Sequence, residues 1–253
     1  MVTDLQKAGI WKRISAGLFD FIMIVMVVMG MVTLLSWILN VDAYSQAYGD
    51  ARNQYQTQYG VQLNITQEEY EALPPEELEA YNAAYQAFIA DEEVLYNYNM
   101  IVNLALLIAT FSILITLLLL EFLIPLLLKN GQTLGKKIFG VALMRTDGVK
   151  VSAVQMFVRT VLGKFTIEIM IPVYILIMIF FNTIGMMSLV ILGAIAVGEL
   201  LCLTLSKTKG LLHDVLAVTV AVDMASQTIF ETPEERVEYI KRLHAEEASR
   251  QEY

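Results

Sequence analysis

Long apolar stretches alternate with polar segments along the chain, and the rest of the sequence is arranged around them. The first apolar stretch covers residues 14–39, and the second covers residues 99–128. Since a helix rises about 1.5 Å per residue, each stretch is long enough to cross a hydrocarbon core of about 30 Å. The first is too long for a cleaved signal peptide, and no Ala-x-Ala site follows it. Both stretches are therefore predicted to be transmembrane helices.

A third apolar region covers residues 167–205. Its length fits two short spans joined at residues 182–185, where the sequence Asn-Thr-Ile-Gly interrupts the apolar run. One long bent helix or a re-entrant pair would fit the same residues. With two spans here, the pattern predicts an all-α polytopic membrane protein with four transmembrane helices.

The segment between the first two spans, residues 41–98, is acidic and rich in tyrosine. It holds eleven acidic residues and one basic residue, Arg52. Thr66 and Glu69 fit a capping box, and Pro75 fits the first turn of another helix. We expect a helical insertion, because the tyrosines give its helices area to bury. Its near-absence of Lys and Arg predicts that it lies outside the cytoplasm.

Residues 129–166 form the second polar segment, which is basic and is therefore predicted to be cytoplasmic. Two β-prone runs, Val141–Arg145 and residues 149–151, are separated by Thr-Asp-Gly, which is a strong hairpin signal. A two-stranded hairpin alone is marginal in water. We therefore expect residues 218–222 to pair with it, which would make a small cytoplasmic β element.

A basic amphipathic helix is expected after this hairpin. Ser152 can cap it, and apolar residues recur at helical spacing as far as Phe165. Such a helix lies in the membrane interface more naturally than it spans the bilayer. An ordinary helix packed on a soluble core is the alternative. Four basic residues of the segment are predicted to face anionic lipid: Lys136, Lys137, Arg159 and Lys164.

Charge also predicts the orientation of the two ends. Lys7, Lys12 and Arg13 precede the first span, and Lys207 and Lys209 follow the last one, so both termini are expected in the cytoplasm. The expected segments are an N-terminal segment with the first span (1–40), the acidic insertion (41–98), the second span (99–128), the cytoplasmic hairpin and amphipathic helix (129–166), the third and fourth spans (167–206) and a cytoplasmic C-terminal segment with a helix (207–253).

Composition is typical of a membrane protein and argues against a disulfide-rich, a thiol–metal or a nucleic-acid-binding protein. Of the 253 residues, 57% are hydrophobic, which is more than soluble domains usually have. The single cysteine, Cys202, leaves no disulfide framework and no thiol–metal cluster. The net charge of −9 hides the segregation of acidic and basic residues along the chain. Anionic lipid explains the basic residues better than nucleic acid does.

No motif indicates an enzyme. His213 and Asp214 are adjacent, but a catalytic dyad also needs a nucleophile and an oxyanion site, and neither is visible. We expect Asp214 to cap a turn or to pair with Arg13 or Arg159. Residues 131–137 lack the spacing of a phosphate-binding loop. The sequence therefore predicts no catalytic residue, no metal and no cofactor.

Two charged residues of the first helix are expected to belong to one cluster. Arg13 and Asp20 are seven residues apart and share a helix face, about 10 Å apart along the axis. A carboxylate in an apolar span is costly unless it is paired or hydrated. We expect Arg13 to bind Asp20 and also Asp214 at the cytoplasmic boundary. The cluster would be either a structural lock or an ion-coupling site.

Three more carboxylates lie in or beside apolar stretches. Glu199 lies well inside the last stretch, Glu121 lies near the end of the second, and Glu168 lies at a span boundary. They could form a cation or proton path, or they could bind the basic residues of the cytoplasmic segment. Glu199 is the hardest to explain by a side chain that reaches the interface, so it and Glu121 are the transport candidates.

A few residues spread over the chain form a recognisable set: Arg13, Asp20, Asp214 and the run Asn-Gly-Gln-Thr-Leu-Gly-Lys-Lys at residues 130–137. In this combination the chain resembles the RDD family of bacterial membrane proteins, which is named for one arginine and two aspartates. The resemblance covers residues 10–20 and about 120–222. It implies a place in the bacterial cytoplasmic membrane and, for some members, sodium–proton exchange or another transport role. The acidic segment is larger than the loop expected there, so the resemblance implies nothing about its role.

The expected function is therefore transport or ion exchange through intramembrane carboxylates. The alternative is a non-catalytic scaffold or assembly protein whose acidic outer domain binds a protein partner. Carboxylates that reach one another and are open to water would favour transport, and a dry bundle with every charge paired would favour the scaffold. Anionic lipid is an expected partner, and a homo-oligomer is compatible with the sequence. No motif specifies the transported ion.

Overall fold

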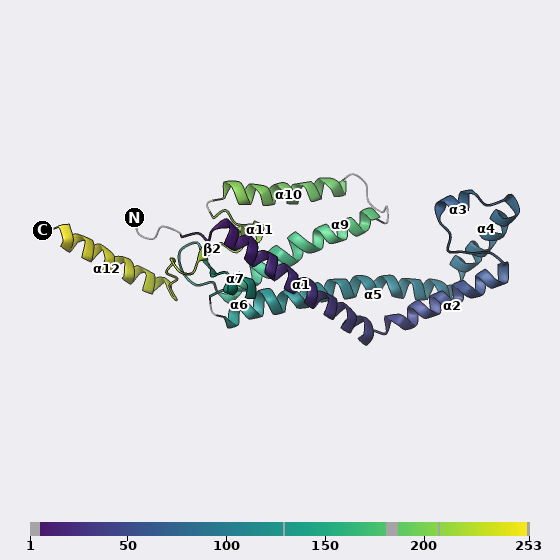
Figure 1. The fold of residues 1–253 in the computed structure, drawn as a ribbon, viewed down its shortest axis with the longest axis horizontal. Coiled ribbons are helices and arrows are strands. Elements are labelled where there is room, and N and C mark those ends of the chain that lie inside the picture. Colours follow the sequence, from purple (N-terminus) through teal and green to yellow (C-terminus); the bar gives the residue numbers. More distant parts are fainter. Residues whose placement is uncertain (1–5, 129, 181–186, 207, 252–253) are drawn as a thin grey trace. The chain divides into compact units, whose positions relative to one another are not determined.

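The computed structural model describes residues 6–128, 130–180, 187–206 and 208–251 (Figure 1). The chain divides into two compact units. One comprises Met1–Val28 with Ile113–Tyr253, and the other comprises Met29–Ser112. Helix α1 (Ile10–Ile38) and helix α5 (Glu92–Leu117) each contribute to both units.

Three helical stretches are long and apolar enough to cross a membrane: Ile10–Ile38, Glu92–Leu127 and Ala153–Ile179. Another apolar helix, Leu189–Leu205, is shorter. The join predicted at residues 182–185 lies outside the described residues. The count of four spans and the cytoplasmic side of both termini stay predictions.

The unit Met29–Ser112 contains the helical insertion that the sequence predicted. Its helices are α2 (Val41–Tyr59), α3 (Gln67–Glu71), α4 (Pro75–Ala90) and the start of α5. The predicted capping box is present, since Thr66 and Glu69 bond each other's backbone amides at the start of α3. Phe88 is buried, and its ring centroid lies 5.4 Å from that of Tyr48 and 5.6 Å from that of Tyr55. The aromatic side chains therefore join α2 to α4.

The other unit is built around an antiparallel pair of strands, β1 (Val141–Arg145) and β2 (Thr219–Asp223). Val141 pairs with Asp223, and Arg145 pairs with Thr219, so the predicted pairing of residues 218–222 with the first β-prone run is confirmed. Buried apolar side chains of both strands form the core on one face: Ala142, Met144, Val220 and Val222.

The second half of the predicted hairpin is only partly formed. Arg145 N–H donates to the Val149 carbonyl, and Met144 forms a single bridge with Lys150. Lys150 N–H donates instead to the Phe230 carbonyl, so residues 149–151 do not continue as a strand. The N-terminal segment covers the opposite edge, where Asp223 N–H donates to the Gln6 carbonyl. The sequence did not predict this covering of the sheet edge.

The predicted interfacial helix is not a separate element, and this corrects the sequence interpretation. Helices α8 (Ala153–Phe157), η2 (Val158–Met170) and α9 (Ile171–Phe180) follow one another without a break. The cap on Ser152 is present as predicted. The apolar run continues beyond Phe165, so the amphipathic part and the next predicted span form one helix.

Two segments of this unit have π-helical geometry, which is rare and often found at functional sites. They are η2 and the shorter η1 (Leu118–Leu123), which continues α5 and leads into α6 (Ile124–Leu127). The remaining helices are α7 (Leu134–Ile138), α10 (Met187–Leu205), α11 (Leu212–Leu216) and α12 (Pro233–Gln251).

Candidate functional site

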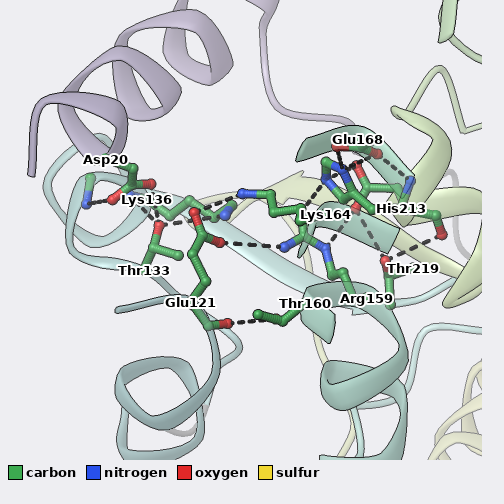
Figure 2. Close-up of polar contacts among 12 residues, drawn as sticks. Asp20, Glu121, Thr133, Lys136, Arg159, Thr160, Lys164, Glu168, His213 and Thr219 are labelled. Carbon is green, nitrogen blue, oxygen red and sulfur yellow. Dashed lines mark hydrogen bonds and ion pairs between the residues drawn. The ribbon is translucent and has the colours of Figure 1, made fainter. Parts of the chain in front are cut away.

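A network of buried polar side chains crosses the unit formed by Met1–Val28 and Ile113–Tyr253. Figure 2 shows Asp20 and Thr133 at one end, Glu121 in the middle, and His213 with Glu168 at the other end. We call this set of contacts the charge network. The described members with buried side chains are Asp20, Glu121, Thr133, Arg159, Thr160, His213, Asp214 and Thr219.

Asp20 is held by uncharged donors. One carboxylate oxygen accepts a hydrogen bond from the Thr133 hydroxyl, and the other accepts one from Gly135 N–H at 2.8 Å (Figure 2). Thr133 also caps α7 by accepting from Lys136 N–H. A Cβ atom at Gly135 would lie 2.3 Å from the Ala16 carbonyl oxygen, so only glycine lets α7 approach α1 this closely.

Arg13 does not belong to the network, which corrects the predicted cluster. Its Nη1 donates to the Lys209 carbonyl at 2.9 Å. Among the described residues it forms no ion pair with Asp20 or Asp214. The shared helix face was inferred correctly from a seven-residue spacing, but such spacing gives no information about donors that other elements bring near Asp20.

Glu121 is the centre of the network and lies on η1. Lys164 Nζ lies 2.7 Å from its Oε1, and Arg159 Nη1 lies 3.8 Å from its Oε2. The Thr160 hydroxyl donates to the backbone carbonyl of Glu121 at 3.0 Å. Because Glu121 is only 1% exposed, this transport candidate is a paired and buried carboxylate.

Arg159 and Asp214 form the best-aligned buried ion pair. Arg159 Nε donates to Asp214 Oδ1 at 2.9 Å, and the Thr219 hydroxyl donates to the same oxygen at 3.1 Å. Burial alone would raise the pKa of Asp214, but the Arg159 guanidinium outweighs it and holds that pKa well below its usual range. The predicted pairing of Asp214 with Arg159 is therefore observed.

The hydrogen-bond partners of His213 define its tautomer. Its Nε2 lies 2.8 Å from Arg159 Nη2, and its Nδ1 lies 2.8 Å from the Glu168 carboxylate. A guanidinium can only donate, so Nε2 must accept, and Nδ1 carries the hydrogen that is donated to Glu168. Burial, together with the nearby Arg159 charge, lowers the pKa of His213. Both observations make His213 a neutral imidazole.

Two carboxyl groups meet beyond His213. Glu168 also accepts from His213 N–H at 2.8 Å, and Glu199 accepts from Leu212 N–H at 3.0 Å through Oε2. The carboxyl groups of Glu168 and Glu199 lie close enough for the charge of one to act on the other. Glu199 Oε1 is buried, and no hydrogen-bond donor among the described residues reaches it. We call these two residues the carboxyl pair.

A close contact of two helices brings His213 into the network. A Cβ atom at Gly163 on η2 would lie 2.5 Å from the His213 Cβ and 2.8 Å from its Cα. Glycine at this position therefore lets α11 lie directly against η2.

Two of the four basic residues that were predicted to face anionic lipid point into the charge network instead. Arg159 and Lys164 bind acidic side chains. Lys136 is half-buried. Burial and the nearby Arg159 charge lower its pKa to about 8, although the attraction of Glu121 opposes this shift. Lys137 is exposed and stays available for the predicted contact with anionic lipid. The prediction failed for Arg159 and Lys164 because their acidic partners come from distant parts of the sequence.

The network has two electrostatically different halves. In the half around Glu121, two acids have a cation close by: Lys164 lies on Glu121, and Arg159 lies on Asp214. At the carboxyl pair, the structure records no Lys or Arg ion pair within the described residues, and the adjacent imidazole is neutral. Sequence reasoning missed the contribution of Thr133. It named Glu168 as a carboxylate at a span boundary but did not identify His213 as its partner.

The described residues contain no group of three or more His, Cys, Asp or Glu side chains arranged to hold a metal ion. Residues 7–218 match the family described as the RDD family. No match was found among curated proteins or among solved structures.

Proposed function

The chain belongs to the RDD family and is an integral membrane protein, and from this premise we propose that it exchanges protons for a monovalent cation across the membrane. The observation that carries the proposal is the carboxyl pair. Glu168 and Glu199 lie on apolar helical stretches with their carboxyl groups close together, and one buried oxygen of Glu199 has no hydrogen-bond donor among the described residues.

The carboxyl pair favours one bound proton on electrostatic grounds. Two adjacent carboxylates repel each other, and a proton between them removes that repulsion. Glu168 already accepts from His213, so its carboxylate is the ionised member. A proton on Glu199 Oε1 would donate to Glu168 and would give this oxygen its missing partner.

The same geometry explains why a cation could replace the proton. When Glu199 loses its proton, the pair carries two negative charges in a region of low dielectric constant. A small cation binds oxygen ligands of this kind and restores neutrality. Proton and cation would then compete for one position, which is the requirement for exchange.

The rival function is a scaffold whose insertion binds another protein. It is supported by the half of the network around Glu121, where Arg159 and Lys164 pair with acids. The compact unit Met29–Ser112 also supports it. The two functions differ in what the carboxyl pair must do, because a scaffold needs no exchangeable proton.

The test uses the purified protein in sealed liposomes that contain a pH-sensitive dye. A gradient of Na⁺ or K⁺ should move protons in the opposite direction in wild type. Glu199→Gln should reduce this movement to the level of protein-free liposomes, whereas Glu234→Gln, at an exposed acid of α12, should not. Wild-type protein without cation-driven proton movement would leave the scaffold as the better account.

A further inference from the structure

Lys164 is a flexible cation that lies between the two halves of the charge network. Its Nζ lies 2.7 Å from Glu121 Oε1, and Figure 2 draws the residue between Glu121 and Glu168. The Lys164 side chain is 19% exposed, whereas that of Arg159 is 4% exposed, so Lys164 is the less tightly enclosed of the two cations. A lysine ammonium is a point charge on a flexible four-carbon stem. It can therefore pair with more than one carboxylate.

The carboxyl pair lies close to this side chain. Lys164 and Glu168 are both on η2 and are four residues apart, which is close to one helical turn, so their side chains leave the helix on the same side. The charge of Lys164 also acts on His213, whose Nδ1 lies 2.8 Å from the Glu168 carboxylate. The ammonium is therefore near the carboxyl pair even while it is bonded to Glu121.

Glu121 keeps other cations when Lys164 leaves it. Arg159 Nη1 lies 3.8 Å from Glu121 Oε2, and the charge of Lys136 also acts on Glu121. Removing every cation from a buried carboxylate is strongly unfavourable. Because two cations remain beside Glu121, movement of Lys164 avoids that cost.

The other titratable groups recorded around the carboxyl pair do not neutralise it. His213 and Asp214 act on the pair from α11, and Cys202 acts on it from α10. The imidazole is neutral, Asp214 is negative, and a thiol carries no positive charge. The charge of Arg159 also acts on the pair, but its guanidinium is bonded to Asp214 and His213. Lys164 is therefore the cation best placed to compensate a second negative charge on the pair.

We propose that Lys164 is the internal counter-ion of the carboxyl pair: it moves from Glu121 to the pair when Glu199 loses its proton, and it returns when a proton or a cation binds there. This role rests on the proposed function, because it requires an exchangeable proton on Glu199. The transported cation then competes with a tethered ammonium, so the pair does not carry two uncompensated negative charges in a region of low dielectric constant.

A double variant that conserves net charge tests this movement. Glu121→Gln combined with Lys164→Gln removes one negative and one positive charge that lie together. If the ion pair stays in place throughout, its loss changes the field at Glu199 little. If Lys164 compensates the carboxyl pair, its loss makes deprotonation of Glu199 harder. The infrared band of the protonated carboxyl group, followed against pH without Na⁺ or K⁺, should then disappear about one pH unit or more higher than in wild type.

The matched control is Glu121→Gln combined with Lys136→Gln. It removes the same charges, since Lys136 also acts on Glu121, but it keeps Lys164. Its band should not disappear at a higher pH than that of wild type. A wild-type titration in the double variant without Lys164, or an equal upward shift in both double variants, would overturn the counter-ion role.

Single variants decide the question if a double variant does not fold. Lys164→Gln and Lys136→Gln each remove one positive charge near Glu121, and Lys164→Gln should shift the titration further. Equal shifts would overturn the role of Lys164. A wild-type band that responds to cations, together with unshifted variants, would remove the counter-ion role and leave the exchange function standing. Wild-type protein without the band would contradict the exchange function, and the counter-ion role with it.

Discussion

The guanidinium of Arg159 lies 2.8 Å from Nε2 of His213, and this contact determines the protonation of the imidazole. Because Arg159 can only donate, His213 must accept at Nε2 and donate from Nδ1 to Glu168. One arginine thus neutralises Asp214 directly and also orients the histidine that bonds the carboxyl pair. Arg159 therefore links the half of the network in which acids are paired with cations to the carboxyl pair.

The first prediction concerns Arg159 itself. Arg159→Ala should destabilise the detergent-solubilised protein by about 3–5 kcal/mol, because it leaves Asp214 as an uncompensated buried charge. Arg159→Lys keeps the charge but cannot bond Asp214 and His213 together, so its unfolding midpoint should fall between those of wild type and Arg159→Ala. Adding Asp214→Asn should partly rescue Arg159→Ala. A wild-type midpoint for Arg159→Ala would contradict the structural role of the pair.

A second prediction concerns the contact of η2 with α11. Gly163→Ala would place a methyl group 2.5 Å from the His213 Cβ, so it should destabilise the protein by about 1–3 kcal/mol. Gly193→Ala on α10 is the matched control, because a Cβ there meets no atom within 4 Å. Thermal unfolding of the two variants should separate them. Equal stability would show that α11 does not lie against η2 as described.

A third prediction is the pH dependence that comes from His213. Burial lowers the pKa of His213 in the folded state, so the unfolded state binds a proton more readily. The stability that the neutral imidazole contributes is fully present above the unfolded pKa, about 6.5, and is lost as the pH falls below it. Asp214 adds no slope here, because its pKa is low in both states and its contribution is lost only in stronger acid.

Unfolding midpoints measured between pH 5 and pH 8 test this dependence. Between pH 8 and pH 5, the stability of wild type should fall relative to that of His213→Gln, because glutamine does not titrate. His244, the other histidine of the chain, is exposed, so His244→Gln should behave as wild type. The same pH dependence in wild type and His213→Gln would contradict the prediction.

A fourth prediction concerns membrane topology. The acidic insertion and the basic segment that precedes α8 are expected on opposite sides of the membrane. Single cysteines at Gln56 and Lys150, placed in a Cys202→Ser background, should therefore react with an impermeant thiol reagent from opposite faces of intact cells. Labelling of both positions from outside would contradict the proposed orientation.

Local sequence signals predicted much of the fold. The capping pairs at Thr66 and Ser152 depend on neighbouring residues, and the structure has both. The pairing of β1 with β2 was expected from two β-prone runs, since a two-stranded hairpin alone is marginal in water, and it is also present. The π-helical geometry of η1 and η2 was not predicted, because it changes the hydrogen-bond register without changing the apolar pattern.

The charge network was predicted less well, since its contacts join residues far apart in the sequence. The acids were recognised as costly in apolar helices, but their partners were assigned by proximity along one helix, which wrongly gave Arg13 to Asp20. The glycines that permit the true contacts, Gly135 and Gly163, carry no signal in a single sequence, because their role is visible only when the opposite element is in place.

The most direct test of the central claim is infrared difference spectroscopy of the carboxyl pair. The account predicts that wild-type protein at neutral pH, prepared without Na⁺ or K⁺, shows the carbonyl stretching band of a buried protonated carboxyl group. Adding Na⁺ or K⁺ should remove this band, and Glu199→Gln should lack it from the start. A wild-type spectrum without the band, or the same cation-sensitive band in Glu199→Gln, would contradict the claim that Glu199 holds the exchangeable proton.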